Sequence, residues 1–217
     1  KNDLKNYPRT FEKDSSLLES FGADFIFHPS EQEMYPTQST EVWDFGQLDK
    51  VMEGAHRPGH FNGVAIIVKK LFEIVKPHKA YFGLKDFQQV AIIKELVKKT
   101  QFPIEIVECP IIREPDGLAM SSRNMLLSPE ARLHAANISK ALFEAIQLSA
   151  SMEVDELKKF VIETINADPM LLVEYFEIVD SLRLRSIKSW DEKCVKVGCV
   201  AVKLGNIRLI DNVTFPI

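Results

Sequence analysis

One lysine, Lys85, follows a short apolar and aromatic segment and a glycine, and precedes a segment with helical periodicity. The apolar segment, residues 79–82, predicts a buried strand, and Gly83 lacks a Cβ, so the chain can turn there. A helix that begins just after Lys85 would direct its free N–H groups and the positive end of its dipole toward the lysine ammonium. Together these groups favour an anion such as a phosphate. The alternative is an ordinary strand, turn and helix with a solvated lysine.

The start of this helix is predicted at about Phe87. Asp86, followed three residues later by Gln89, has the form of a capping box, in which each side chain would bind a free backbone N–H group. Asp86 could also be only an N-cap, and a capping role does not exclude a ligand role. Apolar residues behind it recur at helical spacing: Val90, Ile93, Leu96 and Val97.

A second stretch, residues 113–124, predicts a polar loop because it contains a Pro-Asp-Gly turn. Two hydroxyls and a guanidinium follow in succession, at Ser121, Ser122 and Arg123. A guanidinium can bind two phosphate oxygens at once, and hydroxyl groups can rotate to meet the others. The alternative is that the two serines only cap local backbone groups.

A third stretch, residues 53–63, holds two histidines, an arginine and three glycines in a predicted loop before a helix. Such a loop is a plausible wall of a binding site. His60 could instead cap or pack within its glycine-rich surroundings, and Arg57 could pair with a carboxylate rather than with a substrate.

Taken together, the three stretches resemble the pantothenate synthetase (pantoate–β-alanine ligase) family, whose members join pantoate to β-alanine using ATP. The resemblance rests on residues 57–64, 82–89 and 116–124, at spacings that match the family, and it extends over nearly all of the chain, from Tyr7-Pro-Arg-Thr10 to Ile207–Asn212. Two positions depart from the family pattern: Leu84 stands where Glu is usual, and Asn62 stands where Arg is common.

The His-x-Gly-His type of motif that this family carries on its first strand–helix unit does not occur in the sequence. The resemblance therefore implies that the N-terminal segment of the enzyme is lacking. We therefore expect these 217 residues to be inactive on their own.

If the resemblance holds, the pantoate carboxylate attacks the α-phosphate of ATP, and β-alanine then displaces AMP from the pantoyl adenylate. The resemblance assigns the charge-stabilising work to Lys85 and Arg123, with Ser121 and Ser122 on the phosphates. It implies an ATP site made of Gly83, Leu84, Lys85, Asp86, Ile112, Met120, Ser121, Ser122 and Arg123, with Ile112 and Met120 beside the adenine. It also implies pantoate binding by Gln89, Arg57 and His60.

Magnesium is expected to accompany ATP, because the cation bridges phosphate oxygens, but no acidic cluster in the sequence identifies a protein ligand for it. A homodimer is implied by the resemblance alone.

Composition sets limits on the possible functions. The 217 residues are 46% hydrophobic, and 27 basic residues against 31 acidic ones give a net charge of -4, so no global positive field favours nucleic acid. No apolar run approaches the roughly 18 residues that a membrane span needs, and residues 1–6 do not form a signal peptide, so a cytoplasmic protein is expected. The three cysteines are expected to be reduced core thiols: Cys109, Cys194 and Cys199.

The alternation of strand and helix patterns up to Cys109 predicts an α/β fold with a doubly wound, mostly parallel, Rossmann-like sheet of nucleotidyltransferase type. Residues 1–110 would form this nucleotide-binding domain, incomplete at its N-terminus. Residues 111–217 would form a smaller α+β domain with two helices and a three-stranded antiparallel sheet, whose loop 113–124 closes over the nucleotide.

Two details concern the first 28 residues. The sequence predicts a helix capped by Thr10 and ended by Gly22, and a strand at Asp24–His28. The apolar stripe of the helix is expected to be buried: Phe11, Leu17, Leu18 and Phe21.

Two other functions remain open at this point. One is another nucleotidyltransferase of similar fold, which would make a dinucleotide or an activated head group. The other is a non-catalytic nucleotide-binding or dimerisation segment.

Overall fold

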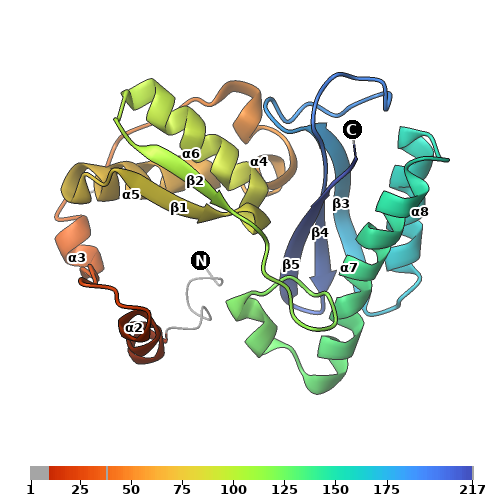
Figure 1. Cartoon of the computed structure of the whole chain (residues 1–217), viewed down its shortest axis with the longest axis horizontal. Helices are drawn as coiled ribbons and strands as arrows, with labels where there is room; N and C mark the ends of the chain where they lie inside the picture. The colour runs from red at the N-terminus through yellow and green to blue at the C-terminus, as the bar shows by residue number, and fades with distance from the viewer. Residues whose placement is uncertain (1–9, 38, 217) are drawn as a thin grey trace. The chain divides into compact units, whose positions relative to one another are not determined.

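The computed structural model of the chain describes residues 10–37 and 39–216, shown in Figure 1. The start of the Tyr7-Pro-Arg-Thr10 motif lies outside these residues. The chain divides into two compact units, one ending at Glu41 and the other beginning at Val42. None of the described helices is long and apolar enough to cross a membrane.

The first unit contains helices α2 (Phe11–Ser20) and α3 (Glu31–Met34). Gly22 ends α2 as expected: it adopts a positive φ of 79°, and Ala23 donates its N–H group to the carbonyl of Leu18 at 3.0 Å. Thr10 is the N-cap residue but its side chain makes no capping hydrogen bond.

Two predictions for this unit are wrong. The apolar stripe of α2 is not buried, since Phe21 is 84% exposed and Leu17 is 56% exposed. No strand forms at 24–28, where Phe25 is 93% exposed. A strand needs a hydrogen-bonded neighbour, and among the described residues of this unit there is no other strand to pair with and only Met34 is buried.

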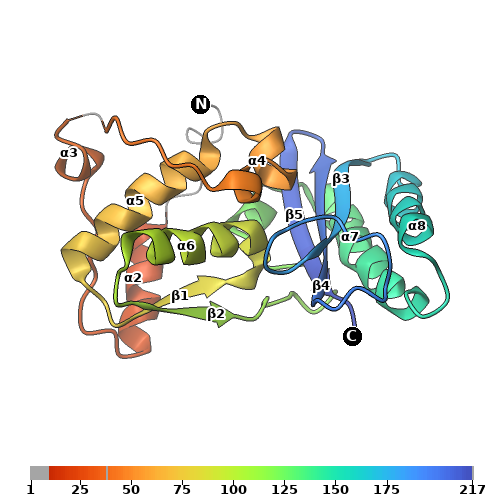
Figure 2. The same ribbon diagram turned by 90° about the horizontal axis from the view of Figure 1, so that it is seen from above.

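The second unit begins with an α/β half, residues 42–110. It consists of η1 (Gly46–Asp49), α4 (Met52–His56), α5 (His60–Val75), β1 (Lys79–Gly83), η2 (Leu84–Asp86), α6 (Phe87–Thr100) and β2 (Glu105–Cys109). Strands β1 and β2 pair in parallel, with Lys79 opposite Glu105 and Gly83 opposite Cys109. Helices α5 and α6 cover the same face of this pair, as Figure 2 shows, and Phe72, Ile92 and Leu96 form the buried core beneath them.

The remaining residues, 111–216, form an α+β half that contains η3 (Ser122–Leu126), α7 (Pro129–Leu148), α8 (Val154–Asn166), β3 (Leu171–Asp180), β4 (Lys196–Leu204) and β5 (Ile207–Thr214). The three strands form an antiparallel sheet in the order β3-β4-β5. The turn between β4 and β5 is the predicted Gly205-Asn206 turn, in which Gly205 has a φ of 58°. The prediction of two helices and a three-stranded sheet is confirmed.

This three-stranded sheet is covered on both faces. Helices α7 and α8 pack on one face around Phe176, Val200 and Phe215, which are 0–1% exposed (Figure 1). On the other face, Val179, Val197 and Cys199 meet Met52 and Phe87 of the α/β half. The two halves therefore share buried surface within one compact unit. The expected domain boundary between residues 110 and 111 stays a prediction.

Four local predictions near the candidate phosphate site need correction. The strand at residues 79–82 forms as β1 but is not buried, since none of its residues is buried and Tyr81 is 65% exposed. Gly83 has a φ of -73°, so it ends β1 in an extended conformation, and the chain turns in η2 instead. Asp86 is the N-cap of α6, but its side chain makes no capping hydrogen bond, so the capping box does not form. The predicted loop 53–63 is partly helical, because α4 ends at His56 and α5 begins at His60.

The three cysteines are unpaired, and one of the three burial predictions is confirmed. Cys199 is buried, while Cys109 and Cys194 are only partly buried.

Candidate functional site

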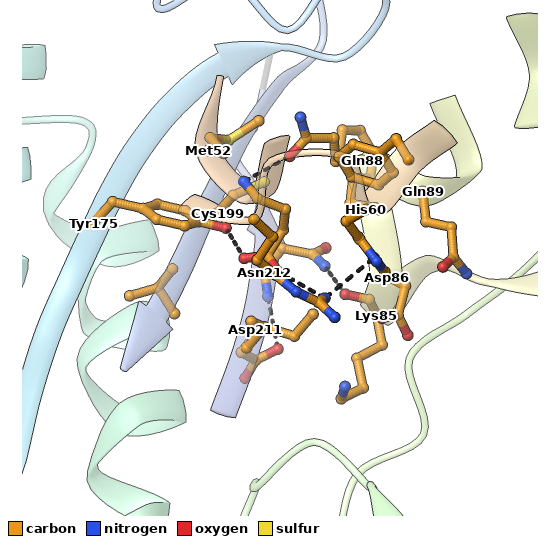
Figure 3. A pocket seen from close by; sticks show the side chains of 16 residues that line it. Met52, His60, Lys85, Asp86, Gln88, Gln89, Tyr175, Cys199, Asp211 and Asn212 are labelled. Carbon is orange, nitrogen blue, oxygen red and sulfur yellow. Dashed lines mark hydrogen bonds and ion pairs between the residues drawn. The ribbon is translucent and has the colours of Figure 1, made fainter. Parts of the chain in front are cut away.

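A pocket opens where the start of α6 meets strands β3, β4 and β5 (Figure 3). Residues from both halves of the second unit line it: Met52, Glu53, Arg57, His60, Phe61, Lys85, Asp86, Phe87, Gln88, Gln89, Tyr175, Cys199, Val200, Ile210, Asp211 and Asn212. We call it the central pocket. Five of the residues that the sequence singled out lie in its wall: Arg57, His60, Lys85, Asp86 and Gln89.

Lys85 reaches the central pocket because β1 ends at Gly83 and η2 then carries the chain into α6. Its ammonium makes no hydrogen bond or ion pair with the residues that the structure describes. Burial raises the pKa of Asp211, and the positive charge of Lys85 counteracts part of that rise. The start of α6 is adjacent, so the helix dipole and the lysine charge favour an anion at the same place.

Arg57 and His60 are held together in the wall of this pocket. A nitrogen of the Arg57 guanidinium, Nη1, lies 3.1 Å from Nε2 of His60. Burial of His60 and the charge of Arg57 lower the pKa of the imidazole, against the opposing charges of Glu53 and Asp86. The imidazole is therefore neutral near pH 7. Because a guanidinium can only donate, Nε2 is the acceptor and the ring proton is on Nδ1.

Glu53 connects the two halves of the unit beneath the pocket. Its carboxylate is 9% exposed and accepts hydrogen bonds from Arg208 Nη2 at 2.6 Å, from Arg208 Nη1 at 2.8 Å and from the Tyr175 hydroxyl at 2.8 Å. Arg57 Nη1 lies 3.5 Å from the same carboxylate. Burial alone would raise the pKa of Glu53, but the contacts with Arg208, Tyr175 and Arg57 outweigh burial and hold the pKa below its ordinary value.

Gln88 fixes the backbone that carries Glu53. Its amide nitrogen donates to the carbonyls of Leu48 at 2.7 Å and Val51 at 2.9 Å, and its oxygen accepts from the N–H group of Glu53 at 2.9 Å. Met52, within this clamp, has a positive φ of 43°, which is strained for a residue with a long side chain. The clamp holds this strained turn in place beside the pocket.

The loop 113–124 is anchored to β5 by its first residue. Arg113 binds the Asp211 carboxylate through two nitrogens, at 2.7 and 3.0 Å, and also donates to the carbonyls of Gly117 and Asn212. Burial raises the pKa of the Asp211 carboxyl, and the two-bond contact with Arg113 opposes that rise. Arg132 pairs with Asp116 and secures the turn of the loop.

The far end of this loop carries the predicted phosphate ligands, and none of them lines the central pocket. Ser121 caps η3 by accepting the N–H group of Arg123 at 3.2 Å, as the alternative interpretation of the serines expected. Arg123 lies close enough to His60 for its charge to add to the effect of burial in lowering the pKa of the imidazole. The structure therefore brings Arg123 near the pocket wall that Lys85 shares.

The two residues expected beside adenine are neighbours. Met120 donates its backbone N–H group to the carbonyl of Ile112 at 2.9 Å. Their side chains are 50% and 65% exposed respectively, outside the central pocket. Gly83 and Leu84 also lie outside its lining, at the end of β1 and in η2.

Several residues that line or support the pocket were not identified from the sequence: Glu53, Gln88, Tyr175, Arg208, Asp211 and Asn212. A signal existed for three of them, because Arg208, Asp211 and Asn212 are polar residues within an otherwise apolar terminal strand. Buried polar groups in such a strand need partners, and here the partners lie around the pocket.

Known proteins match this chain along nearly all of its length. A family model described as pantoate-beta-alanine ligase matches residues 1–214. The pantothenate synthetase of Bacteroides fragilis strain YCH46 is 54% identical over 215 residues, which cover 99% of this chain and 76% of that protein. The pantothenate synthetase of Porphyromonas gingivalis strain ATCC 33277 is 49% identical, with the same coverage.

Solved structures give the same result as the sequence comparisons. The pantothenate synthetase of Thermus thermophilus superposes with a TM-score of 0.92 at 40% identity, covering 97% of this chain and 77% of that one. The pantoate-beta-alanine ligase of Francisella tularensis, solved in complex with beta-gamma ATP and beta-alanine, has a TM-score of 0.79 at 32% identity and covers 98% of this chain and 73% of that one. The chain belongs to the pantoate-beta-alanine ligase family.

Proposed function

We propose that this protein condenses pantoate with β-alanine, using ATP, in two steps. The pantoate carboxylate attacks the α-phosphorus of ATP, which forms a pantoyl adenylate and releases pyrophosphate. The amine of β-alanine then attacks the acyl carbon, the acyl C–O bond breaks, and AMP leaves with that oxygen. The observation that carries the proposal is that Lys85, Arg57, His60 and Gln89, from two separate stretches of a family member, line one pocket.

Lys85 is the cation proposed for the ATP phosphates. Reactions of this kind need positioning and charge neutralisation more than a covalent residue. The lysine ammonium has no acidic partner among the described residues and lies beside the start of α6, so it is available to an anion. The backbone of residues 83–86, including Leu84, and the exposed Asp86 complete this side of the proposed ATP site. A Cβ at Gly83 would meet nothing within 4 Å, so the backbone there is open to a ligand.

The loop 113–124 would supply the opposite side. Ser121, Ser122 and Arg123 can bind the negative oxygens of ATP, and Ile112 and Met120 can pack against adenine. Arg113 fixes the base of this loop to β5, while the exposed Met120 and Ile112 are available for contact with a planar ring.

Gln89, Arg57 and His60 are proposed for pantoate. The guanidinium of Arg57 can neutralise the pantoate carboxylate before it attacks ATP. A neutral His60 with its proton on Nδ1 leaves the positive charge on Arg57, and the Gln89 amide can bind the hydroxyl groups of pantoate.

Mg²⁺ is proposed to arrive with ATP. Among the described residues there is no group of three or more His, Cys, Asp or Glu side chains able to hold a metal ion, so the phosphates would supply most of the oxygen ligands. When bound, the ion offsets phosphate charge. A homodimer and a cytoplasmic location are also proposed, both on the resemblance and composition set out above.

The test is the fate of an ¹⁸O label in the pantoate carboxylate, followed in the complete encoded protein. An adenylate pathway places one ¹⁸O atom in AMP and releases pyrophosphate only when pantoate is present. Release of ADP and phosphate, or AMP without label, contradicts the proposal. Other carboxylic acids in place of pantoate serve as the control and should support little pyrophosphate release. An AMP group that stays on the product would instead indicate another nucleotidyltransferase.

A further inference from the structure

The last strand, β5, carries a polar residue that the proposed mechanism does not use. Asn212 is 6% exposed and lines the central pocket. Its side-chain nitrogen donates to two consecutive backbone carbonyls, that of Leu84 at 2.8 Å and that of Lys85 at 3.1 Å. The side-chain nitrogen of Asn212 is therefore committed to the turn that carries Lys85.

This contact fixes the direction of the backbone in η2. A trans peptide is planar, and its N–H group points opposite to its carbonyl. Since the carbonyls of Leu84 and Lys85 point at Asn212, the N–H groups of Lys85 and Asp86 must point away from it. Asn212 thus determines where two backbone donors of the proposed ATP site are directed.

Asn212 is itself held rigidly, and by the loop that would close over the same ligand. Its N–H group donates to the Asp211 carboxylate at 2.7 Å, and its carbonyl accepts from Arg113 at 3.2 Å. Arg113 also binds Asp211 through two nitrogens, at 2.7 and 3.0 Å. Two adjacent residues of β5 therefore fasten both η2 and the base of the loop 113–124.

We propose that Asn212 is a positioning residue for ATP, which fixes the turn of Lys85 relative to the loop 113–124. This inference rests on the proposed function, in which that turn binds the phosphates. Asn212 acts through Lys85 and the backbone of η2, and needs no contact of its own with the nucleotide.

The test compares Asn212→Ala and Asn212→Asp in the complete encoded protein. Alanine removes both donors, and aspartate keeps the shape but directs an acceptor at two carbonyl oxygens. Two lost hydrogen bonds correspond to about a tenfold weaker ATP affinity for Asn212→Ala, with a larger loss for Asn212→Asp. The KM for β-alanine should stay near its original value. Titration calorimetry measures the dissociation constant for ATP, and steady-state kinetics measure the KM values for ATP, pantoate and β-alanine.

Val213→Ala is the matched control. Val213 is the next residue of β5, is 6% exposed and belongs to the core on the other side of the sheet, so its truncation lowers stability without touching η2. It should lower the melting temperature and leave ATP affinity unchanged.

The outcomes distinguish a failure of the proposed function from a failure of the positioning role of Asn212. If the unsubstituted protein does not bind ATP, the proposed function is wrong. If it does bind ATP and the two Asn212 variants bind ATP as well as the unsubstituted protein does, or bind all three substrates more weakly in parallel with a lower melting temperature, Asn212 has only a structural role. Asn212→Ser keeps one donor, and partial recovery of ATP affinity in this variant supports the positioning role.

Discussion

At the scale of the residue, the sequence singled out several side chains that line the central pocket, but not the side chains that hold them. Lys85, Arg57 and His60 could be found because each stands among glycines or at a predicted helix start. Glu53 and Arg208 could not be paired from sequence. They are 155 residues apart, and their contact depends on how β5 packs against the α/β half.

Glu53 should make the protein sensitive to acid. The pKa of its carboxyl is held below the ordinary 4.5, so the unfolded chain binds a proton at a higher pH than the folded one. The stability that Glu53 contributes is present above pH 4.5 and is lost as pH falls through the lower folded value. Glu53→Gln should lower the free energy of unfolding at pH 7 by about 2 kcal/mol, because Arg208 loses the more buried of its two carboxylate partners and keeps only Glu174.

Urea unfolding of the Glu53→Gln variant and of the unsubstituted protein, from pH 7 down to pH 3, checks this expectation. The difference between Glu53→Gln and the unsubstituted protein should shrink as pH falls below 4.5. The control is Glu105→Gln, which breaks an exposed pair with Lys79 and should change stability by at most about 1 kcal/mol. A constant difference across this pH range would show that the Glu53 carboxylate contributes nothing through its charge.

At the scale of the element, helix α6 begins at Phe87, as predicted, because the apolar residues behind that position recur at helical spacing. The capping box is the instructive exception. Asp86 and Gln89 have the right spacing, but η2 precedes α6 and Asp86 has a ψ of 57°, outside the extended region that an N-cap usually adopts. Residue spacing alone cannot reveal a 3-10 turn that joins a strand to a helix.

Ser128 is a cap that does form, at the start of α7, and its loss should be measurable. Its hydroxyl accepts the N–H group of Ala131 at 3.1 Å, with Pro129 at the first helical position. Ser128→Ala should lower the free energy of unfolding by about 1 kcal/mol. Ser151 lies just after α7, and its exposed hydroxyl donates to the carbonyl of Leu148. Ser151→Ala should lower the free energy of unfolding by less than Ser128→Ala does. Equal effects of the two substitutions in urea unfolding would refute the capping account.

At the scale of the whole molecule, the fold class follows from the order of the strand and helix patterns. The parallel β1–β2 pair and the antiparallel β3-β4-β5 sheet were both expected. What the patterns could not give is the environment of residues 10–41. The apolar stripe of α2 and the segment 24–28 have the composition of buried elements, but burial depends on neighbours that a local pattern does not contain.

The central claim is that Lys85, in a pocket built from both halves of the second unit, neutralises the phosphates of ATP. Turnover of Lys85→Ala in the complete encoded protein tests it most directly, with Lys98→Ala as control, because Lys98 lies in the last turn of α6 with its side chain 80% exposed. Lys85→Ala should reduce turnover by about 100-fold or more, the loss typical of an electrostatic stabiliser, with unchanged unfolding. Near-normal turnover of Lys85→Ala, matching that of Lys98→Ala, would contradict the claim.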